Sequence, residues 1–349
     1  MKKSIKFISM AATAMVLVSC GPKVTKQLYL NTFSPEESGL NLVKITDEAA
    51  GSVIAGSTNK MTEVENKNKT FTNSLRGWCR AAALTWYAPT NLAISPDGTK
   101  LAYLTRNNGQ DNVVIRSAGS MGVSTQRTFR NVVGGFCWGK DNKIYFADAN
   151  RPNYYISSVS ADQGTVMSQH TNGNVDDSYP ALSDDGNILF FTRYNSTYGP
   201  SIWSLNLKDG TLSSCARGYN ACPVPGNNNA FYCVRNASVG KSEIWLVDFV
   251  KGQESLLLSD VNRSFTSPTL SPDGKWLLVV GNSASNISHQ QNLDIFAVRT
   301  DGSQLTQLTY HPMTDMCPVW SRDGKYIYFI SSRANENSSY NIWRMSFNL

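Results

Sequence analysis

Ser95-Pro96-Asp97-Gly98 is the first copy of a four-residue phrase that recurs along the chain. Three further copies keep its serine, aspartate and glycine: Ser183-Asp184-Asp185-Gly186, Ser271-Pro272-Asp273-Gly274 and Ser321-Arg322-Asp323-Gly324. Two divergent copies lie between them: Gly139-Lys140-Asp141-Asn142 and Gly226-Asn227-Asn228-Asn229. Counted at the third residue of each copy, the spacings are 44, 44, 43, 45 and 50 residues. A nearly constant period of this size is the signature of a repeat architecture.

Each copy has the composition of a tight turn between two β-strands. Proline presets φ, aspartate accepts hydrogen bonds from nearby backbone groups, and glycine adopts a φ that other residues resist. Short apolar runs flank the turns, as Leu92-Ala93-Ile94 and Leu101-Ala102-Tyr103-Leu104 do in the first repeat. A third run, such as Ile202-Trp203-Ser204-Leu205, and a fourth, such as residues 305–309, complete the unit. Four strands in each of six units predict an all-β protein, a six-bladed β-propeller of four-stranded antiparallel blades.

The repeated phrase carries a family resemblance. The pattern Pro-x-Trp/Leu-Ser-Pro-Asp-Gly-x-x-Ile/Leu-x-Phe/Tyr resembles the PD40 repeats, which are WD40-like, of the TolB-like propellers. The resemblance covers about residues 84–349. It implies the propeller fold and says little about activity, because one fold hosts many functions.

The last repeat stops after its third strand, and the ring needs a fourth strand from the N-terminal side to cover that edge. Ala83-Leu84-Thr85 and the residues after it resemble Gln307-Leu308-Thr309 and the residues after it. We therefore expect residues 80–85 to pair with residues 340–347 and close the ring. The predicted propeller then spans residues 80–349.

The N-terminus has the form of a lipoprotein signal. Three lysines precede an apolar core, and Leu17-Val18-Ser19-Cys20 forms a lipobox, so we predict a signal peptide over residues 1–19 and lipidation of Cys20. A transmembrane helix is the alternative, but about 20 apolar residues are needed to span a bilayer, and this core is shorter. Gly21 follows the cysteine, which in Gram-negative lipoproteins implies the outer membrane. We expect the chain to face the periplasm.

Residues 20–79 are mostly polar and predict a lipidated tether with little regular structure. The chain has 349 residues and a net charge of +6, and loss of the signal's three lysines lowers this to about +3. The sequence contains no basic block interleaved with aromatic residues. Charge and compartment together argue against a nucleic-acid partner.

The cysteines leave two alternatives. Cys222 and Cys233 flank the divergent turn of the fourth repeat at matching distances, so they could form a disulfide across two strands. They could equally be two free thiols packed among apolar side chains. No Cys-x-x-Cys or Cys/His zinc spacing occurs, and we predict neither a metal nor a cofactor.

The loops opposite the Asp-Gly turns are longer and more varied, so we expect a binding site there. The ligand-binding candidates on this face are Trp86, Tyr87, Asp177, Tyr179, Arg263, Tyr310, His311 and Asp315. An arginine also recurs at the end of the second strand in four repeats: Arg106, Arg193, Arg235 and Arg333. These arginines either form a cationic ring or pair with loop carboxylates, and their repetition favours pairing. Trp203, Trp245 and Trp343 occupy equal places in the third strand, which predicts packing between blades.

No catalytic set is evident. The chain has three histidines and no Gly-x-Ser-x-Gly nucleophile elbow. Some PD40 propellers resemble oligogalacturonate lyase, whose manganese site uses several His and a Gln, and the residues that could imitate it are His289, Gln290, Gln291 and His311. The leading hypothesis is a lipid-anchored, non-enzymatic scaffold that binds an envelope protein or peptide. The alternative, based on the loop aromatics, is a propeller that binds or degrades oligosaccharides.

Overall fold

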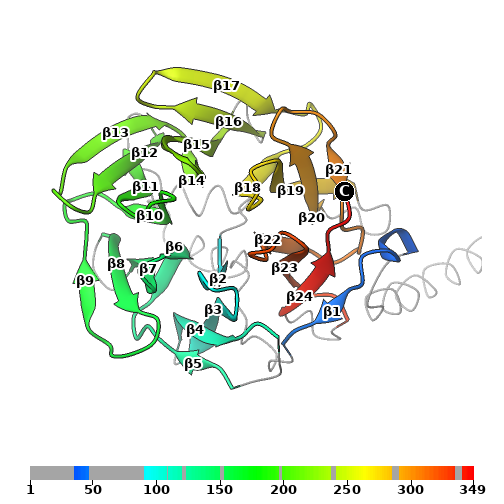
Figure 1. The fold of residues 1–349 in the computed structure, drawn as a ribbon, viewed down its shortest axis with the longest axis horizontal. Helices are drawn as coiled ribbons and strands as arrows, with labels where there is room; N and C mark the ends of the chain where they lie inside the picture. Colours follow the sequence, from blue (N-terminus) through cyan, green and yellow to red (C-terminus); the bar gives the residue numbers. More distant parts are fainter. Residues whose placement is uncertain are drawn as a thin grey trace, which may run out of the picture.

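The computed structural model describes residues 35–46, 90–107, 109–119, 123–149, 153–195, 199–236, 241–284, 291–334 and 340–349. These residues form six four-stranded antiparallel sheets arranged as the blades of a ring (Figure 1). The one helical element among them is a single 3-10 turn, η1 (Pro35–Glu37). The predicted six-bladed propeller is confirmed.

Within each blade, the four strands lie side by side in order from the ring axis outward. The innermost strands are β2 (Leu92–Ile94), β6 (Val132–Trp138), β10 (Asp177–Leu182), β14 (Tyr219–Val224), β18 (Phe265–Leu270) and β22 (Asp315–Trp320). The second strands are β3 (Lys100–Asn107), β7 (Lys143–Asp148), β11 (Ile188–Asn195), β15 (Asn227–Asn236), β19 (Trp276–Ala284) and β23 (Tyr326–Ser331). We number the blades 1 to 6 in this order.

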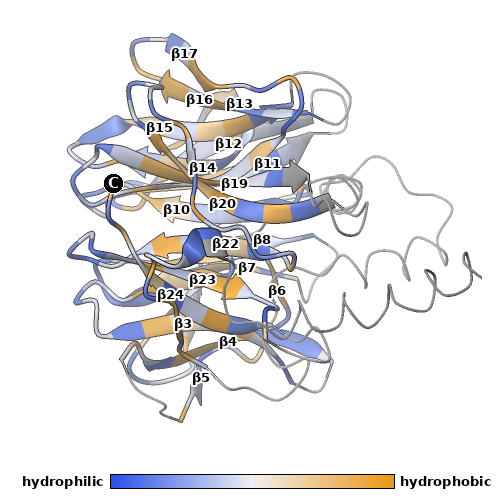
Figure 2. Ribbon diagram, turned by 90° about the vertical axis from the view of Figure 1, so that its right-hand side faces the viewer, coloured by the Kyte–Doolittle hydropathy of each residue, from blue (hydrophilic) through white to orange (hydrophobic). Residues whose placement is uncertain are grey.

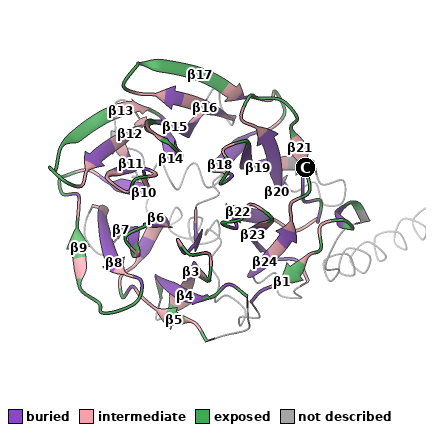
Figure 3. Ribbon diagram, viewed as in Figure 1, coloured by how far each residue is buried: buried purple, intermediate pink, exposed green. Residues whose placement is uncertain are grey.

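The two outer positions complete each blade. The third strands are β4 (Gln110–Ser117), β8 (Tyr155–Ser160), β12 (Gly199–Asn206), β16 (Ser242–Asp248), β20 (Gln291–Arg299) and β24 (Asn341–Ser346). The outermost strands are β5 (Thr125–Gln126), β9 (Met167–Gln169), β13 (Leu212–Arg217), β17 (Gln253–Leu258), β21 (Thr306–Gln307) and β1 (Val43–Lys44). Exposure is concentrated in this outer layer, where β13 and β17 are largely solvent-exposed (Figure 3).

The repeated phrase forms the turn between the first and second strands. In the first copy, Ser95 Oγ donates to Asp97 Oδ1 at 2.5 Å and accepts from Lys100 N at 2.9 Å. The same serine–aspartate bond recurs at 2.6 Å in the three other well-kept copies. The bond from Ser95, with further bonds from Thr99, lowers the pKa of Asp97 to about 2. The phrase therefore recurs because its side chains hold the turn.

Hydrophobic residues are concentrated in the strands, and hydrophilic residues are common at the turns (Figure 2). Six clusters of buried residues occupy the seams, one at each junction between blades. Trp203, Trp245 and Trp343 belong to three of these clusters, so their predicted role in packing between blades is confirmed.

The ring closes through a strand that lies earlier in the sequence than we predicted. β1 pairs with β24, with Val43 opposite Arg344 and Lys44 opposite Trp343, and Figure 1 shows the two strands side by side. Ile45 N also donates to Ile342 O at 2.8 Å. A strand from the N-terminal side is confirmed, but the prediction of residues 80–85 in this place was wrong, because residues 43–44 occupy it.

A side chain reinforces the closure between blades 6 and 1. Arg322 Nε donates to Ser95 O at 3.0 Å, and Arg322 Nη2 donates to Ile94 O at 3.1 Å. The arginine of the sixth turn therefore caps backbone carbonyls of the first turn. Residues 35–46, which we call the strap, lie in the stretch predicted as tether and pack as part of blade 6. The other proposed limits of signal and tether fall outside the described residues.

Of the two alternatives for Cys222 and Cys233, the structure shows two free thiols and no disulfide. Both Cys222 and Cys233 are free. The register of β14 and β15 sets Cys222 opposite Tyr232, so Cys233 points to the other face of the sheet. Cys222 packs toward blade 5, whereas Cys233 packs toward blade 3. Burial raises the pKa of each thiol to about 12.

Candidate functional site

The four recurring arginines form close ion pairs. Arg106 pairs with Asp111 at 2.7 Å, and Arg193 binds both oxygens of Asp177 at 2.8 and 2.9 Å. Arg235 binds both oxygens of Glu254, at 2.8 Å each. Arg193 and Arg235 also stack on tryptophans of the third strand. The pairing interpretation is confirmed, and these cations stiffen their blades.

The fourth arginine joins the strap to blade 6. Arg333 donates to both oxygens of Glu37 at 3.0 and 3.1 Å and to Asp315 Oδ2 at 2.5 Å. All three side chains are fully buried. Tyr310 N donates to Glu37 Oε1 at 2.8 Å, so the strap carboxylate also binds the connection that leads into β22. Because burial outweighs the attraction of Arg333, the pKa of Asp315 rises to about 6.

Replacing Asp315 with Asn is expected to remove a pH-dependent loss of stability. The pKa of Asp315 is about 6 in the folded state against an ordinary 3.8, so the folded state keeps the proton longer. The free energy of unfolding should therefore fall in the wild type, relative to D315N, as pH rises from about 4 to about 6. Urea unfolding of both proteins across this range measures the difference. Two parallel pH profiles would contradict the assignment.

The predicted ligand-binding residues that the structure describes do not assemble into one exposed site. Trp86, Tyr87, His289 and the lipidation candidate Cys20 lie outside the described residues. Asp177 and Asp315 are buried in the arginine pairs, and burial raises the pKa of Asp177 as well. His311 is fully buried, and its Nδ1 accepts from Met313 N at 3.1 Å. These three side chains hold loops in place.

Tyr179 is also structural. It is 1 % exposed and has φ of +52°, within a break in the register of β10 and β11. Equivalent breaks with left-handed residues recur in neighbouring inner strands, at Asn220, Ser267 and Cys317. Because the feature repeats from blade to blade, it shapes the inner strands and does not mark one site.

Two predicted residues keep exposed surface. Arg263 pairs with Asp260 at 3.6 Å and stacks on Phe296. Tyr310 is 41 % exposed, and its pKa is raised by partial burial and by the nearby Asp294. They lie on different connections, between β17 and β18 and between β21 and β22.

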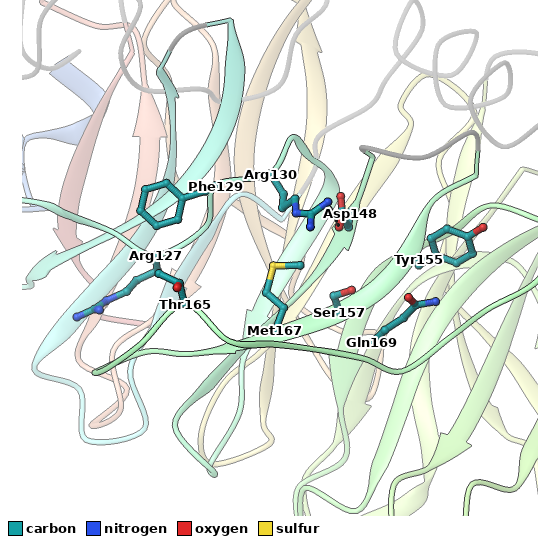
Figure 4. Close-up of a pocket in the computed structure, with 9 residues that line it drawn as sticks. All are labelled: Arg127, Phe129, Arg130, Asp148, Tyr155, Ser157, Thr165, Met167 and Gln169. Atoms are coloured by element: carbon teal, nitrogen blue, oxygen red, sulfur yellow. Dashed lines mark ion pairs between the residues drawn. The ribbon is translucent and has the colours of Figure 1, made fainter.

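A groove of about 540 Å³ opens instead on the rim, where blades 1 and 2 meet. One wall is the connection between β5 and β6, and the other is formed by β7, β8, β9 and the turn between the last two. Its lining residues are Arg127, Phe129, Arg130, Asp148, Tyr155, Ser157, Thr165, Met167 and Gln169 (Figure 4). The lining mixes two cations, one carboxylate, two aromatic rings and several neutral hydrogen-bonding groups.

Thr128 fixes the wall formed by the connection. Its Oγ1 accepts from Val113 N at 2.8 Å and donates to Asn112 Oδ1 at 3.2 Å. Arg130 N donates to the same Asn112 oxygen at 3.0 Å. Thr128 is 1 % exposed, whereas its neighbour Phe129 is 58 % exposed. A buried threonine thus anchors the connection and turns the phenylalanine outward, beside the groove.

The two groove arginines are weakly paired. Arg130 Nη1 lies 3.9 Å from Asp148 Oδ2, longer than a hydrogen bond. Arg127 Nε is shielded from solvent and has no hydrogen-bond partner among the residues that the structure describes. Both cations therefore retain capacity to bind an acceptor, unlike the four recurring arginines.

The described residues include neither a metal-binding cluster nor a helix of the length and apolarity that crossing a bilayer needs. One serine–histidine pair is present, with Ser158 Oγ 2.8 Å from His170 Nε2. Ser158 is 1 % exposed, so its hydroxyl cannot reach a substrate. Nothing in this pair indicates nucleophilic catalysis.

Reasoning from the sequence missed the groove. The pattern Arg127-Thr128-Phe129-Arg130 stands in one connection between blades, a place where the site was expected. Its exposed aromatic between two cations was the available signal, and among the described connections between blades no other repeats it. Residues that recur between blades mark structural roles, and this connection does not recur.

Comparison with known proteins supports the fold. No family model matches the chain. An uncharacterized protein of Agrobacterium fabrum is 26 % identical over 171 residues, which are 48 % of this chain and 53 % of the relative. The chain thus matches about half the length of that relative.

Solved structures resemble it over a longer span. A candidate TolB of Agrobacterium tumefaciens has a TM-score of 0.55 at 15 % identity, covering 74 % of this chain and 90 % of that one. TolB of Acinetobacter baumannii also has a TM-score of 0.55 at 16 % identity, and the match covers 77 % of this chain and 67 % of that one. Oligogalacturonate lyase of Vibrio parahaemolyticus has a TM-score of 0.51 at 9 % identity, and the match covers 88 % of this chain and 97 % of that one. At these identities the likeness is one of fold: the chain is a six-bladed propeller that resembles the propellers of these proteins.

Proposed function

We propose that this chain is a lipid-anchored propeller of the cell envelope that binds a protein or peptide partner without chemical turnover. The partner docks in the groove between blades 1 and 2. The observation that carries the proposal is the groove itself, an open site whose walls are held by packing and by Thr128 while its two cations remain weakly paired.

The lip of the groove favours a macromolecular partner. Phe129 is 58 % exposed, and Val166, in the turn that leads to Thr165, is 87 % exposed. An aromatic anchor beside an arginine is the combination enriched at protein interfaces. Because the exposed Phe129 lines the groove, a partner that fills the groove also covers its ring.

The anchor follows from the lipobox at Leu17-Val18-Ser19-Cys20. Acylated Cys20 attaches the chain to the outer membrane, and the propeller faces the periplasm at the end of the tether. In this arrangement the membrane contact is made by lipid, which leaves the rim of the propeller available to an envelope partner.

Site-specific crosslinking tests the docking site. Benzoylphenylalanine in place of Phe129 is expected to capture a discrete partner in intact cells. The same probe in place of Val261, which is 86 % exposed on the connection between blades 4 and 5, serves as the matched control. Equal capture at both positions, or capture at position 261 alone, would reject the groove as the docking site.

A glycan is the second candidate, because Tyr155, Gln169 and the Arg130–Asp148 pair could bind hydroxyl groups while Phe129 stacks on a sugar ring. Oligosaccharide binding by the mature chain, lost in both Gln169→Ala and Phe129→Ala, would favour this candidate. Shortened oligosaccharide products would move it to the enzyme class.

A further inference from the structure

We infer that the groove recognises an extended acidic segment of its partner, with carboxylates at the two arginines and an apolar side chain between them. This inference rests on the proposed function and names the chemistry of the same site. It follows from the pairing of the arginines, the order of side chains along the groove and the free edge of β9.

The arginines of the groove differ from the four recurring arginines in how closely they approach carboxylates. The four recurring arginines lie 2.5 to 3.1 Å from carboxylate oxygens. In the groove, Arg130 reaches its carboxylate at 3.9 Å, and Arg127 Nε lacks a partner among the described side chains and backbone. A carboxylate that meets the guanidinium from the groove would supply an acceptor that the described residues do not give it. Of these six arginines, the two in the groove are therefore the ones suited to an external anion.

The nearby carboxylates do not neutralise the site. The lining holds two arginines and one carboxylate, Asp148, so it carries a net positive charge. Asp162 lies close enough to Arg127 for its pKa to be affected, but it already pairs with Lys100 at 3.0 Å and accepts from Asn142. A partner carboxylate would therefore meet excess positive charge.

The side chains are ordered along the groove. Figure 4 shows Arg130 reaching toward Asp148, whereas the guanidinium of Arg127 points in the opposite direction, away from Thr165. Phe129 and Met167 lie between these ends. Positive charge at both ends and an apolar middle match a segment in which acidic residues flank a bulky apolar residue.

The edge of β9 favours an extended backbone. β9 is the outermost strand of blade 2. His170 N donates inward to Ile156 O at 2.8 Å, and backbone groups alternate in direction along a strand. The backbone groups of Met167 and Gln169 consequently point to the outer edge, beside the side chains with which they line the groove. An added strand could pair there.

Peptide binding tests the inference. The probe is a fluorescein-labelled peptide of alternating Glu and Leu, and its counterpart carries Gln at each Glu. We expect the Glu peptide to bind the mature chain about tenfold more tightly than the Gln peptide, with R127Q and R130Q each removing about tenfold of that affinity. Arg299→Gln, on blade 5, is the matched control and should leave the affinity unchanged.

The outcomes separate this inference from the proposed function. Equal affinity for both peptides, no binding of the Glu peptide, or insensitivity to R127Q and R130Q would overturn the acidic segment. Crosslinking at position 129 would in that case still support docking in the groove. If an oligosaccharide of uronic acids binds through the two arginines and the Glu peptide does not, the occupant is a glycan. An unchanged melting temperature in R127Q and R130Q shows that any loss of binding is not a loss of folding.

Discussion

Replacement of Arg333 by methionine should lower the free energy of unfolding by about 3–5 kcal/mol, the largest effect of any single charge in this propeller. Glu37 and Asp315 are fully buried on either side of the guanidinium. Methionine keeps much of the side-chain volume but leaves both carboxylates without a cation. The strap would then lose its main polar attachment to blade 6.

Urea unfolding at neutral pH measures this loss. The matched control is Arg106→Met, because the Arg106–Asp111 pair has similar geometry but its arginine is 28 % exposed. We expect that control to change stability by no more than about 1 kcal/mol. A similar small effect for R333M would show that the buried pairs contribute little, and that backbone bonds, the Thr46 hydroxyl and apolar packing hold the strap.

The second large effect is expected from Phe231→Ala, at about 3–5 kcal/mol. Phe231 is fully buried in the seam between blades 3 and 4. Its ring centroid lies 5.4 Å from that of Phe190 and 6.0 Å from that of Phe249. Truncation would leave a cavity that β-strands on both sides cannot collapse to fill, so both the lost burial and the cavity weaken the fold.

Phe129→Ala provides the control for the same chemical change. Phe129 is 58 % exposed, so its removal should alter the free energy of unfolding by no more than about 0.5 kcal/mol. The two variants together separate stability from binding, since only Phe129 lies in the groove. Equal destabilisation by both would contradict the packing described for the seam.

The turns were predictable because their chemistry is local. Serine and aspartate two residues apart bond each other wherever they occur in the phrase, so a pattern of four letters reports the structure directly. The divergent copy in blade 2 follows the same logic. A side chain at Gly139 would meet Asp141 Oδ1 and lie 2.8 Å from Leu182. Tyr145 Oη donates to Asp141 at 2.9 Å in place of the missing serine.

The closing strand was misplaced because two segments share a short motif. Leu84-Thr85 and Ile45-Thr46 both resemble Leu308-Thr309. The structure shows what the threonine does: Thr309 Oγ1 accepts from Ile295 N at 2.9 Å, and Thr46 Oγ1 accepts from Ile342 N at 2.9 Å. A two-residue motif could not show which of the two segments supplies the closing strand. The preceding Glu37, which meets Arg333 in space, gave no sign of its partner in the sequence.

The groove was harder to predict than the fold for a related reason. Repeats reveal what every blade shares, whereas the groove depends on one connection and on the distance between Arg130 and Asp148, which come from separate elements. Asp177, His311 and Asp315 have residue types typical of sites, but burial assigns them to the scaffold. Exposure decides between these roles, and a single sequence does not report it.

The ion pair between Glu37 and Arg333 also bears on the order in which the propeller folds. The two residues are 296 positions apart, so the contact cannot form until nearly the whole chain is present. Contacts of such long range are the slowest to form, and edges left unpaired meanwhile invite association with other chains. A chain that stops before Arg333 could assemble its early blades but would lack the cation that fastens its own beginning. The ion pair between Glu37 and Arg333 is therefore expected to form late in folding, after the sixth repeat has been synthesised.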